Sequence, residues 1–449
     1  MLRSFRVANH KSIRAEQELA LMPAYDSPRP VVPVAAVYGA NATGKSNLLD
    51  GFRFMRHAVR ASFGNWEAGT GVPRTPFRLE TAMLGEPSSF VVDLVLPDGA
   101  YVYGFSVDDA EVVEEWLYRF GDSHRKTVIF ERVGTAVALG DSLRERVTRA
   151  KLLSSALRGN ALLLSVAAQV GEQPEFAPVY RWFRTSLRLR PANTLRQRSL
   201  VDRVPSAKEA YPGYLDLVRA ADLDITDIRV EQDEASPTQI DQFLIGQLDQ
   251  EMARLRQSAE AADADAGLER RLARLESQRR ALSQGPRRRK LVFVQRGGTL
   301  MTAAEQSSGT LAYIDVLTDV LAVLDTGGVL IVDEIDTSLH PRLLVRLIEL
   351  FRHPDTNPHH AQLVFATHDA TLLGTSFGHE ILRRDEIWFT DKEQGATTLY
   401  PLTDFHPRKE DNRERRYLGG SYGAVPAVFS DTLVDTLLAS RSELADGAP

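Results

Sequence analysis

One stretch of the chain decides the fold that we expect, residues Tyr38–Asn47, which read Tyr-Gly-Ala-Asn-Ala-Thr-Gly-Lys-Ser-Asn. Within it, Gly39–Ser46 match the pattern G-x-x-x-x-G-K-[ST] between an apolar strand-like run and residues at helical spacing. In that context the backbone N–H groups of the loop surround phosphate oxygens. Lys45 adds a positive charge to them, and the Ser46 hydroxyl is a ligand for Mg²⁺. The sequence therefore predicts a phosphate-binding loop.

A second apolar run ends in two carboxylates. Val329–Val332 is followed directly by Asp333 and Glu334. Acidic residues often follow strands without any catalytic role, but this pair follows a phosphate loop along the chain, which favours a catalytic role. We therefore expect Asp333 to hold Mg²⁺, directly or through water, and Glu334 to orient or deprotonate an attacking water molecule.

A third apolar run, Gln362–Ala366, ends in Thr367 and His368. The helical pattern from Pro341 to Phe351 lies between the second and third runs, which makes a βαβ unit and hence a parallel sheet. Parallel strands bring their carboxyl ends to one edge of the sheet. We expect His368 to reach the γ-phosphate there.

The remaining pattern predicts a mixed α/β fold interrupted by a helical region. Residues 88–106 read as a β-hairpin, and 111–120 and 126–132 as further strands of the same sheet. Residues 141–220 read as mostly helical, and 241–284 as two heptad-patterned helices folded back on each other or an ordinary amphipathic pair. We expect the head to consist of residues 1–135 and 291–449, with 136–290 as the insertion.

Composition excludes several classes of protein. The 449 residues contain 43% hydrophobic and 25% charged residues, as in ordinary globular proteins. The absence of cysteine excludes disulfides, Cys-ligated zinc and a zinc hook at the tip of the helical hairpin. No signal peptide or membrane-spanning run is evident, so we expect a cytoplasmic protein without a membrane partner.

Basic residues cluster although the formal net charge is −6. Arg287–Lys290 form one cluster, and a longer one has Trp182 and Phe183 interleaved. The arginines of the longer cluster are Arg181, Arg184, Arg188, Arg190, Arg196, Arg198 and Arg203. Such clusters suit a phosphate backbone, whereas solvated helix faces or salt bridges explain them equally well, so DNA is kept open as a partner.

The order of these motifs resembles the ABC-type ATPases of the SMC, Rad50, RecF and OLD kind, and more narrowly the bacterial AAA15-type ATP-binding proteins. The resemblance includes the stretches Asp333–Pro341 and Arg384–Phe389, and it covers about residues 1–130 and 290–430. It implies an α/β fold, a P-loop ABC-type ATPase head of mixed sheet plus parallel βα core with an inserted short coiled coil. ATP and Mg²⁺ are the implied cofactors.

The resemblance also implies a role for each site residue. Glu334 and His368 are the catalytic residues, and Ser46 and Asp333 hold the metal. A second head would present Ser307, Ser308 and Gly309, which on their own read as a helix N-cap, to the nucleotide, while Asp336, Ser338 and His340 lie in a loop crossing that interface. The nucleotide-binding residues are Gly39, Asn41, Ala42, Thr43, Gly44, Lys45, Ser46 and Asn47.

One departure from the pattern affects the metal site. Such ATPases usually carry a metal-binding Gln after the strand that follows the phosphate-loop helix, and no Gln occurs between Gln17 and Gln169. Thr75 or Glu80 takes its place, or the metal relies on Ser46, Asp333 and water.

Three functions follow from these expectations. The first is an ATPase switch in bacterial anti-phage defence, a head-to-head dimer or higher homo-oligomer that controls a separately encoded effector, which family resemblance suggests is a nuclease. The second is a DNA-repair or DNA-sensing ATPase like RecF or Rad50, and the third is a nucleotide-gated scaffold with negligible turnover. Phosphate release and DNA binding distinguish them.

Overall fold

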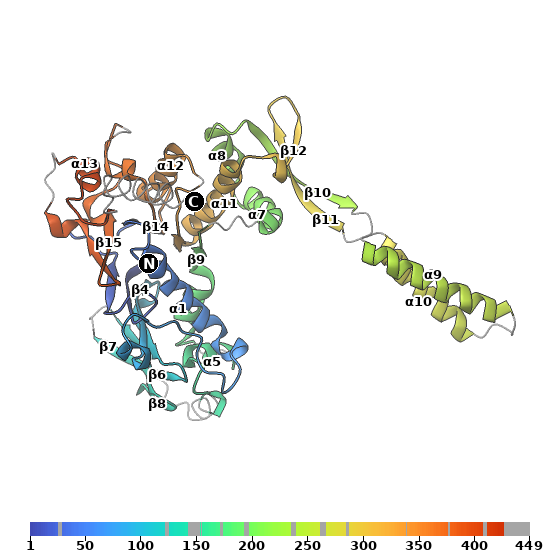
Figure 1. Cartoon of the computed structure of the whole chain (residues 1–449), viewed down its shortest axis with the longest axis horizontal. Coiled ribbons are helices and arrows are strands. Elements are labelled where there is room, and N and C mark those ends of the chain that lie inside the picture. The colour runs from blue at the N-terminus through green and yellow to red at the C-terminus, as the bar shows by residue number, and fades with distance from the viewer. Residues whose placement is uncertain are drawn as a thin grey trace, which may run out of the picture. The chain divides into compact units, whose positions relative to one another are not determined.

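The computed structural model divides the chain into two compact units, Met1–Thr194 with Asp319–Pro449, and Leu195–Thr318. Figure 1 labels many of its helices and strands. The structure describes all residues except 26–28, 122–124, 142–152, 154, 171–173, 193–196, 235–238, 261–265, 284–286, 338, 376–377, 407–410 and 426–449. Residues 136–194, placed in the insertion by the sequence, fall in the first unit, because the strand at 187–190 joins its parallel sheet. The boundaries at 135 and 290 stay a prediction.

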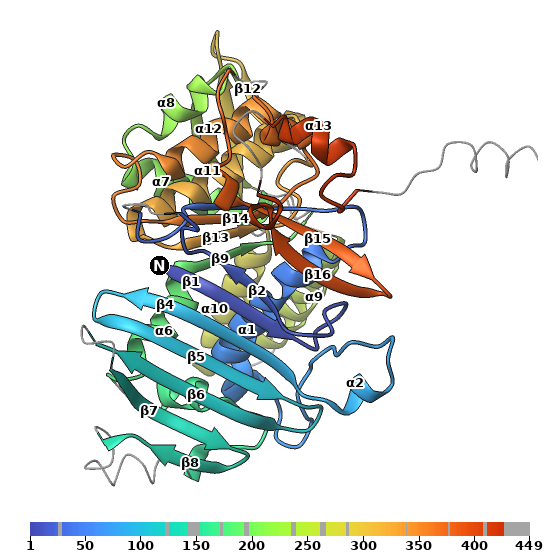
Figure 2. The ribbon, with the colours of Figure 1, turned by 90° about the vertical axis from the view of Figure 1, so that its left-hand side faces the viewer.

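The first unit contains an antiparallel sheet with seven strands. Figure 2 shows them side by side. In sheet order they are β2 (Gln17–Ala20), β1 (Leu2–Ala8), β4 (Ser88–Leu96), β5 (Gly99–Val107), β6 (Val112–Phe120), β7 (Lys126–Val133) and β8 (Ala136–Leu139). Alternate residues of β4 and β5 are buried, as in a sheet with one covered face. The predicted hairpin at 88–106 and the strands that extend it are confirmed.

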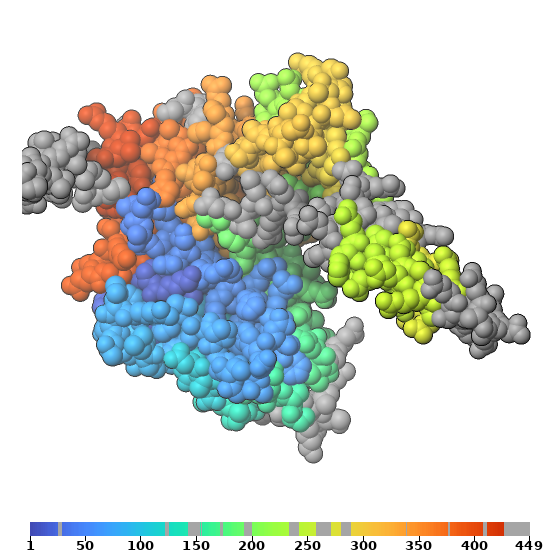
Figure 3. All heavy atoms as spheres, turned by 45° about the vertical axis from the view of Figure 1, so that its right-hand side comes forward, coloured from blue at the N-terminus to red at the C-terminus, as the bar shows by residue number. Residues whose placement is uncertain are grey.

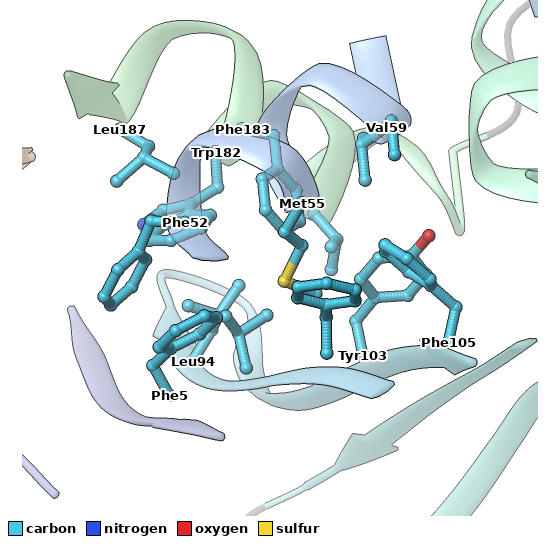
Figure 4. Packing of buried hydrophobic residues seen from close by; sticks show 14 of the residues in the cluster. Phe5, Phe52, Met55, Val59, Leu94, Tyr103, Phe105, Trp182, Phe183 and Leu187 are labelled. Atoms are coloured by element: carbon cyan, nitrogen blue, oxygen red, sulfur yellow. The ribbon is translucent and has the colours of Figure 1, made fainter. Parts of the chain in front are cut away.

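Helix α1 (Lys45–Asn65) covers the buried face of this sheet. Phe52 stacks on Phe5 of β1, with ring centroids 3.7 Å apart, and Met55 and Tyr103 of β5 lie in one apolar cluster (Figure 4). Trp182 and Phe183 belong to the same apolar cluster. The helix that begins with Lys45 is therefore fixed by the core along its length.

The parallel sheet of the first unit carries the predicted motif strands. Its order is β16 (Ala396–Pro401), β15 (Ile387–Glu393), β3 (Val34–Tyr38), β14 (Gln362–Ala366), β13 (Val329–Val332) and β9 (Leu187–Arg190). All neighbours are parallel except β15 and β16, which form an antiparallel hairpin. All residues of β3, β13 and β14 are buried, which explains why these strands read as continuous apolar runs. The mixed α/β fold expected from the sequence is confirmed.

Besides α1, the described part of the first unit contains helical elements within and outside 141–194, a span that the sequence predicts to be mostly helical. They are α2 (Ala82–Gly85), α5 (Leu163–Gln169), α6 (Ala177–Arg181), the π-helical turn η1 (Trp182–Ser186), α12 (Pro341–Arg352), α13 (Arg413–Leu418) and the 3-10 turns η3 (Ala370–Leu373), η4 (Arg384–Glu386) and η5 (Leu402–Phe405). The helical interpretation was wrong at β9, whose four residues pair with β13. Because arginines make up half of β9, its sequence does not indicate that it pairs with the apolar strand β13.

The second unit contains an antiparallel ribbon and a helical hairpin. The three-stranded sheet has the order β10 (Ile225–Glu234), β11 (Arg287–Gln295) and β12 (Leu300–Thr302). Its helical elements are α7 (Gln197–Ala210), α8 (Tyr214–Ala220), α9 (Gln239–Glu260), α10 (Ala266–Ser283) and the turn η2 (Ala303–Glu305), and α11 (Ser308–Thr326) runs from it into the first unit.

The hairpin of α9 and α10 agrees with the heptad pattern, and its helices lie side by side in Figure 1. Figure 3 shows the same segment in yellow-green with all its side chains. Met252 and Leu275 are buried between exposed residues. Ion pairs cross from helix to helix, with Arg271 Nη2 3.0 Å from Glu251 Oε1. The tip of the hairpin lies outside the described residues. Among the described helices, none combines the length and apolar character needed to cross a membrane.

Candidate functional site

The predicted phosphate loop connects β3 to α1. The strand ends at Tyr38, and the chain turns through two residues with positive φ, Ala42 at 66° and Gly44 at 109°, before the helix begins at Lys45. Gly44 occupies the N-cap position and offers no side-chain acceptor to the first-turn N–H groups. An anion at this helix end would satisfy those donors and interact favourably with the helix dipole.

Lys45 lies over the loop that it follows. Its side-chain Nζ donates to the backbone oxygens of Gly39 at 2.8 Å and Ala40 at 3.0 Å. Only 6% of the residue is exposed. Burial lowers the pKa of Lys45, and the carboxylates of Asp333, Asp336 and Glu334 oppose that shift. A buried ammonium group surrounded by carboxylates marks the centre of the site.

The end of β13 lies against the start of α1. Ser46 Oγ donates to Asp333 Oδ1 at 3.1 Å, although the two residues are 287 positions apart. The backbone N–H of Asp333 donates to Arg190 O at 2.9 Å, so β9 fixes the backbone that carries the carboxylate. Burial raises the pKa of Asp333, and the neighbouring Glu334 raises it further, while the Ser46 hydrogen bond and Lys45 oppose the shift.

These two oxygen ligands fit a magnesium ion. Mg²⁺ in phosphate-binding proteins keeps water and phosphate oxygens and takes only one or two protein ligands. Ser46 Oγ and Asp333 Oδ1 are such a pair, and the described residues contain no group of three His, Cys, Asp or Glu side chains suited to a metal. The donor set therefore suits a metal shared with phosphate rather than a site made by protein alone.

Glu334 adopts an unusual backbone conformation. Its φ is 50°, in the left-handed region that non-glycine residues seldom occupy. Its carbonyl oxygen accepts from the N–H of Thr337 at 3.2 Å, and Ile335 N–H donates to Ala366 O at the end of β14. Such conformations cost about 1–3 kcal/mol and persist where surrounding contacts enforce them.

His368 follows β14 and contacts the segment after Glu334. Its backbone N–H donates to Asp336 Oδ2 at 2.9 Å. The other oxygen of that carboxylate, Oδ1, is buried without a hydrogen-bond partner among the described residues. Burial lowers the pKa of His368, and Lys45 lowers it further against the opposing carboxylates. Both effects favour the neutral form of the imidazole.

The structure gives several other predicted residues local contacts. His340 caps α12, since its Nδ1 accepts from Arg342 N–H at 3.2 Å. Asn41 and Ala42 are exposed on the loop, and Asn47 Nδ2 donates to Ser12 Oγ at 2.7 Å. Ser338 lies outside the described residues. The role of His340 and Ser338 at an interface stays a prediction.

The predicted signature residues lie in the second unit, at the start of α11. Ser307 acts as its N-cap, because Ser307 Oγ accepts from Thr310 N–H at 3.0 Å. Ser308 and Gly309 form the first turn. This contact accounts for Ser307 locally, and the action of the three residues on a second head stays a prediction.

The two candidates for the missing glutamine have other partners. The carbonyl oxygen of Thr75 accepts from Lys11 N–H at 2.8 Å, and Glu80 Oε2 lies 3.2 Å from Arg14 Nη1. Both contacts involve the turn between β1 and β2. A metal-binding role for either residue stays a prediction.

The sequence analysis missed two residues that hydrogen-bond to the phosphate loop. Thr390 Oγ1 lies 2.7 Å from Thr43 Oγ1, and Thr397 Oγ1 donates to Thr43 O at 2.7 Å. Both threonines are buried on the β15–β16 hairpin, more than 340 positions further along the chain. No local motif marks them, and only the pairing of β15 with β3 brings them to the loop.

A glycine-rich loop between a buried strand and a helix, with an acidic strand end hydrogen-bonded to its Ser, defines the class of P-loop ATPases. The match to a family model described as "AAA domain, putative AbiEii toxin, Type IV TA system" extends over residues 34–374. The chain belongs to this AAA domain family. No curated protein matches the sequence.

Solved structures similar to this chain include two heads of SMC proteins. The SMC head domain from Thermotoga maritima is 12% identical, with a TM-score of 0.36, and the match covers 89% of this chain and 98% of that one. The Smc head domain with an extended coiled coil from Pyrococcus furiosus, bound to the C-terminal domain of ScpA, is 13% identical with a TM-score of 0.37, and the match covers 90% and 97%.

Proposed function

We propose that this protein binds ATP with Mg²⁺ and hydrolyses it as a nucleotide-driven switch. The observation that carries the proposal is the hydrogen bond from Ser46 to Asp333, which joins the phosphate loop to the acidic strand end. Family membership supports the same activity. Lys45 and the N-terminus of α1 supply the positive potential that a triphosphate needs.

Each residue of the site has a proposed task. Lys45 neutralises phosphate charge, and Ser46 and Asp333 hold Mg²⁺, which when bound supplies further charge neutralisation on the phosphate oxygens. Glu334 orients the attacking water and accepts its proton. His368, whose pKa is lowered by burial and by Lys45, donates or accepts a hydrogen bond at the terminal phosphate. The remaining loop residues, Gly39, Asn41, Ala42, Thr43, Gly44 and Asn47, bind or shape the nucleotide pocket.

We further propose that two heads close on the nucleotide. Ser307, Ser308 and Gly309 of one protomer would contact the phosphates held by Lys45 of its partner, and Asp336, Ser338 and His340 would line the contact between heads. ATP binding closes the heads and hydrolysis opens them. This motion would control a separately encoded effector, a nuclease in bacterial anti-phage defence by family resemblance.

DNA binding of the RecF or Rad50 type receives less support from the arginine clusters. Arg188 and Arg190 pair with the buried carboxylate of Asp319 at 3.2 and 2.8 Å. Arg203 pairs with Asp315 in the second unit at 2.6 Å. These charges are neutralised within the protein, which favours the salt-bridge explanation of the cluster. Arg196 lies outside the described residues.

The second basic cluster is also partly neutralised. Arg289 Nη1 lies 2.5 Å from Asp202 Oδ1, and the register of β10 and β11 sets Glu231 opposite Lys290. An exposed cationic strip for a phosphate backbone would lack such partners. A DNA role stays the second candidate, tested by salt-dependent retardation of duplex DNA.

Phosphate release by the wild type and by Glu334→Gln tests the proposed activity. Removing a general base slows the chemical step by about 10²–10⁴-fold, while the neutral amide keeps the shape of the side chain and nucleotide binding. We expect hydrolysis that needs Mg²⁺ in the wild type and almost none in the variant. Equal release by both proteins would leave only the nucleotide-gated scaffold.

A further inference from the structure

Two buried threonines of the β15–β16 hairpin hold the backbone of the phosphate loop. Thr390 has none of its surface exposed and Thr397 has 2%. Thr397 Oγ1 donates to the carbonyl oxygen of Thr43 at 2.7 Å, and Thr390 Oγ1 lies 3.2 Å from the carbonyl oxygen of Tyr38. The contacted carbonyls belong to the residue before the loop and to the residue before Gly44.

The contact at Thr397 is the end of a directed chain of hydrogen bonds. Asn47 Nδ2, in the first turn of α1, donates to Ser12 Oγ at 2.7 Å. Ser12 Oγ lies 2.7 Å from Thr397 Oγ1, whose own proton is engaged with Thr43 O. Ser12 must therefore donate to Thr397. Each hydroxyl in the chain both accepts and donates, so removing one of them leaves its neighbours without a partner.

The contact at Thr390 shares its protons with the loop. Thr43 Oγ1 lies 2.9 Å from Ala40 O and 2.7 Å from Thr390 Oγ1. Two hydroxyl protons thus serve three contacts, those to Ala40 O, to Tyr38 O and between the hydroxyls. Every arrangement of the protons connects the hairpin to the loop, because Thr390 donates either to Tyr38 O or to Thr43 Oγ1.

These contacts determine where the loop N–H groups point. A trans peptide unit is planar, and its C=O and N–H point in opposite directions. With the carbonyl of Thr43 directed at Thr397, the N–H of Gly44 is directed away from the hairpin. The same reasoning applies to Tyr38 and the N–H of Gly39. Anion binding at such a loop depends on these directions.

The glycines of the loop also reflect the closeness of the hairpin. A β-carbon on Gly39 would collide with the hydroxyl of Thr390, and one on Gly44 would collide with the hydroxyl of Thr397. The two threonines therefore require glycine at both positions, whether or not a ligand is bound at the loop.

We propose that Thr390 and Thr397 are positioning residues that set the nucleotide affinity of the phosphate loop from the C-terminal hairpin. This inference rests on the proposed ATP binding. It gives the β15–β16 hairpin, which lies outside the phosphate-loop motif, an influence on nucleotide affinity. A change in the position of β16 would then alter nucleotide affinity without touching the nucleotide.

The test compares the ATP dissociation constants of Thr397→Val and Thr397→Ser with that of the wild type by calorimetry. Valine removes the hydroxyl at nearly constant size, and serine retains it. We expect Thr397→Val to weaken binding about tenfold, equivalent to about 1.4 kcal/mol, and Thr397→Ser to restore most of it. Thr390→Val should weaken binding less, because Thr43 can still donate to Ala40 O.

Two controls separate positioning from loss of structure. Thr398→Val changes the next residue of β16, whose hydroxyl contacts Asp391 O at 3.4 Å rather than the loop, and should bind ATP normally. Thr397→Val should unfold at a lower temperature than Thr397→Ser, since it loses buried hydrogen bonds, but it should remain fully folded at the temperature of the calorimetry. Wild-type affinity in Thr397→Val, or an equal loss in the serine variant, would overturn the inference. Normal ATP affinity in Lys45→Ala would instead overturn the proposed function.

Discussion

Replacing Asp333 by Asn should change ATP affinity in opposite directions with and without Mg²⁺. The carboxylate accepts from Ser46 Oγ at 3.1 Å, and among the carboxylates it does most to oppose the lowered pKa of Lys45. The Asn side chain has the same size, and its amide oxygen can still accept from Ser46. The substitution therefore removes one negative charge and little else from the site.

The magnitude follows from the distances at the site. Two unit charges about 4 Å apart interact by about 4 kcal/mol at an effective dielectric constant near 20, and solvent and salt reduce this value at a half-buried group. We expect affinity for ATP with Mg²⁺ to fall by about ten- to a hundredfold, or about 1.4–2.8 kcal/mol. In EDTA the carboxylate only repels the triphosphate, so the variant should bind ATP more tightly than the wild type.

Calorimetric titration in Mg²⁺ and in EDTA measures both effects. Asp336→Asn is the matched control, since it removes the same charge from a carboxylate that accepts from His368 N–H and not from Ser46. It should weaken binding in Mg²⁺ far less. A metal-binding role for Asp333 would be contradicted if Asp333→Asn weakened ATP binding equally in Mg²⁺ and in EDTA. It would also be contradicted if Asp336→Asn lost as much affinity in Mg²⁺ as Asp333→Asn.

Two further predictions concern stability. Arg132→Met should lower the free energy of unfolding by about 3–5 kcal/mol in urea titrations, because it leaves the fully buried Glu115 without its ion-pair partner at 3.3 Å. A variant that also carries Glu115→Gln should recover part of the loss. An unchanged unfolding midpoint in Arg132→Met would contradict this role of the ion pair. Burial tends to raise the pKa of Asp50, but hydrogen bonds with His10 and Lys11 hold this pKa well below the ordinary 3.8. The stability that Asp50 contributes should therefore be complete at neutral pH and be lost as the pH falls below 3.8. The unfolding free energies of Asp50→Asn and wild type should converge in acid, and an equal difference at every pH would contradict this role.

The residues proposed for the centre of the site could be found in the sequence because they belong to local patterns. The loop from Gly39 to Ser46 has its own signature, and buried parallel strands such as β13 and β14 read as apolar runs that end in polar residues. The neighbourhood of Ser46 and Asp333 followed from topology alone, because carboxyl ends of parallel strands share an edge.

The sequence could not predict contacts that depend on strand order. Thr390 and Thr397 lie in a polar, alternating hairpin of ordinary appearance, and their relation to Thr43 arises only when β15 pairs with β3. The strand β9 was missed because arginines alternate with leucines along its four residues. Its arginines are neutralised by Asp319, which no charge count along the chain reveals.

The most direct test of the central claim is the calorimetric titration of ATP with Mg²⁺ into the wild type and Lys45→Ala. The amine of Lys45 is the one buried positive charge of the described loop, and its removal leaves Asp333, Glu334 and Asp336 facing the phosphates uncompensated. We predict saturable binding to the wild type and no measurable binding to the variant. Equal affinity in the two proteins would contradict ATP binding at this loop.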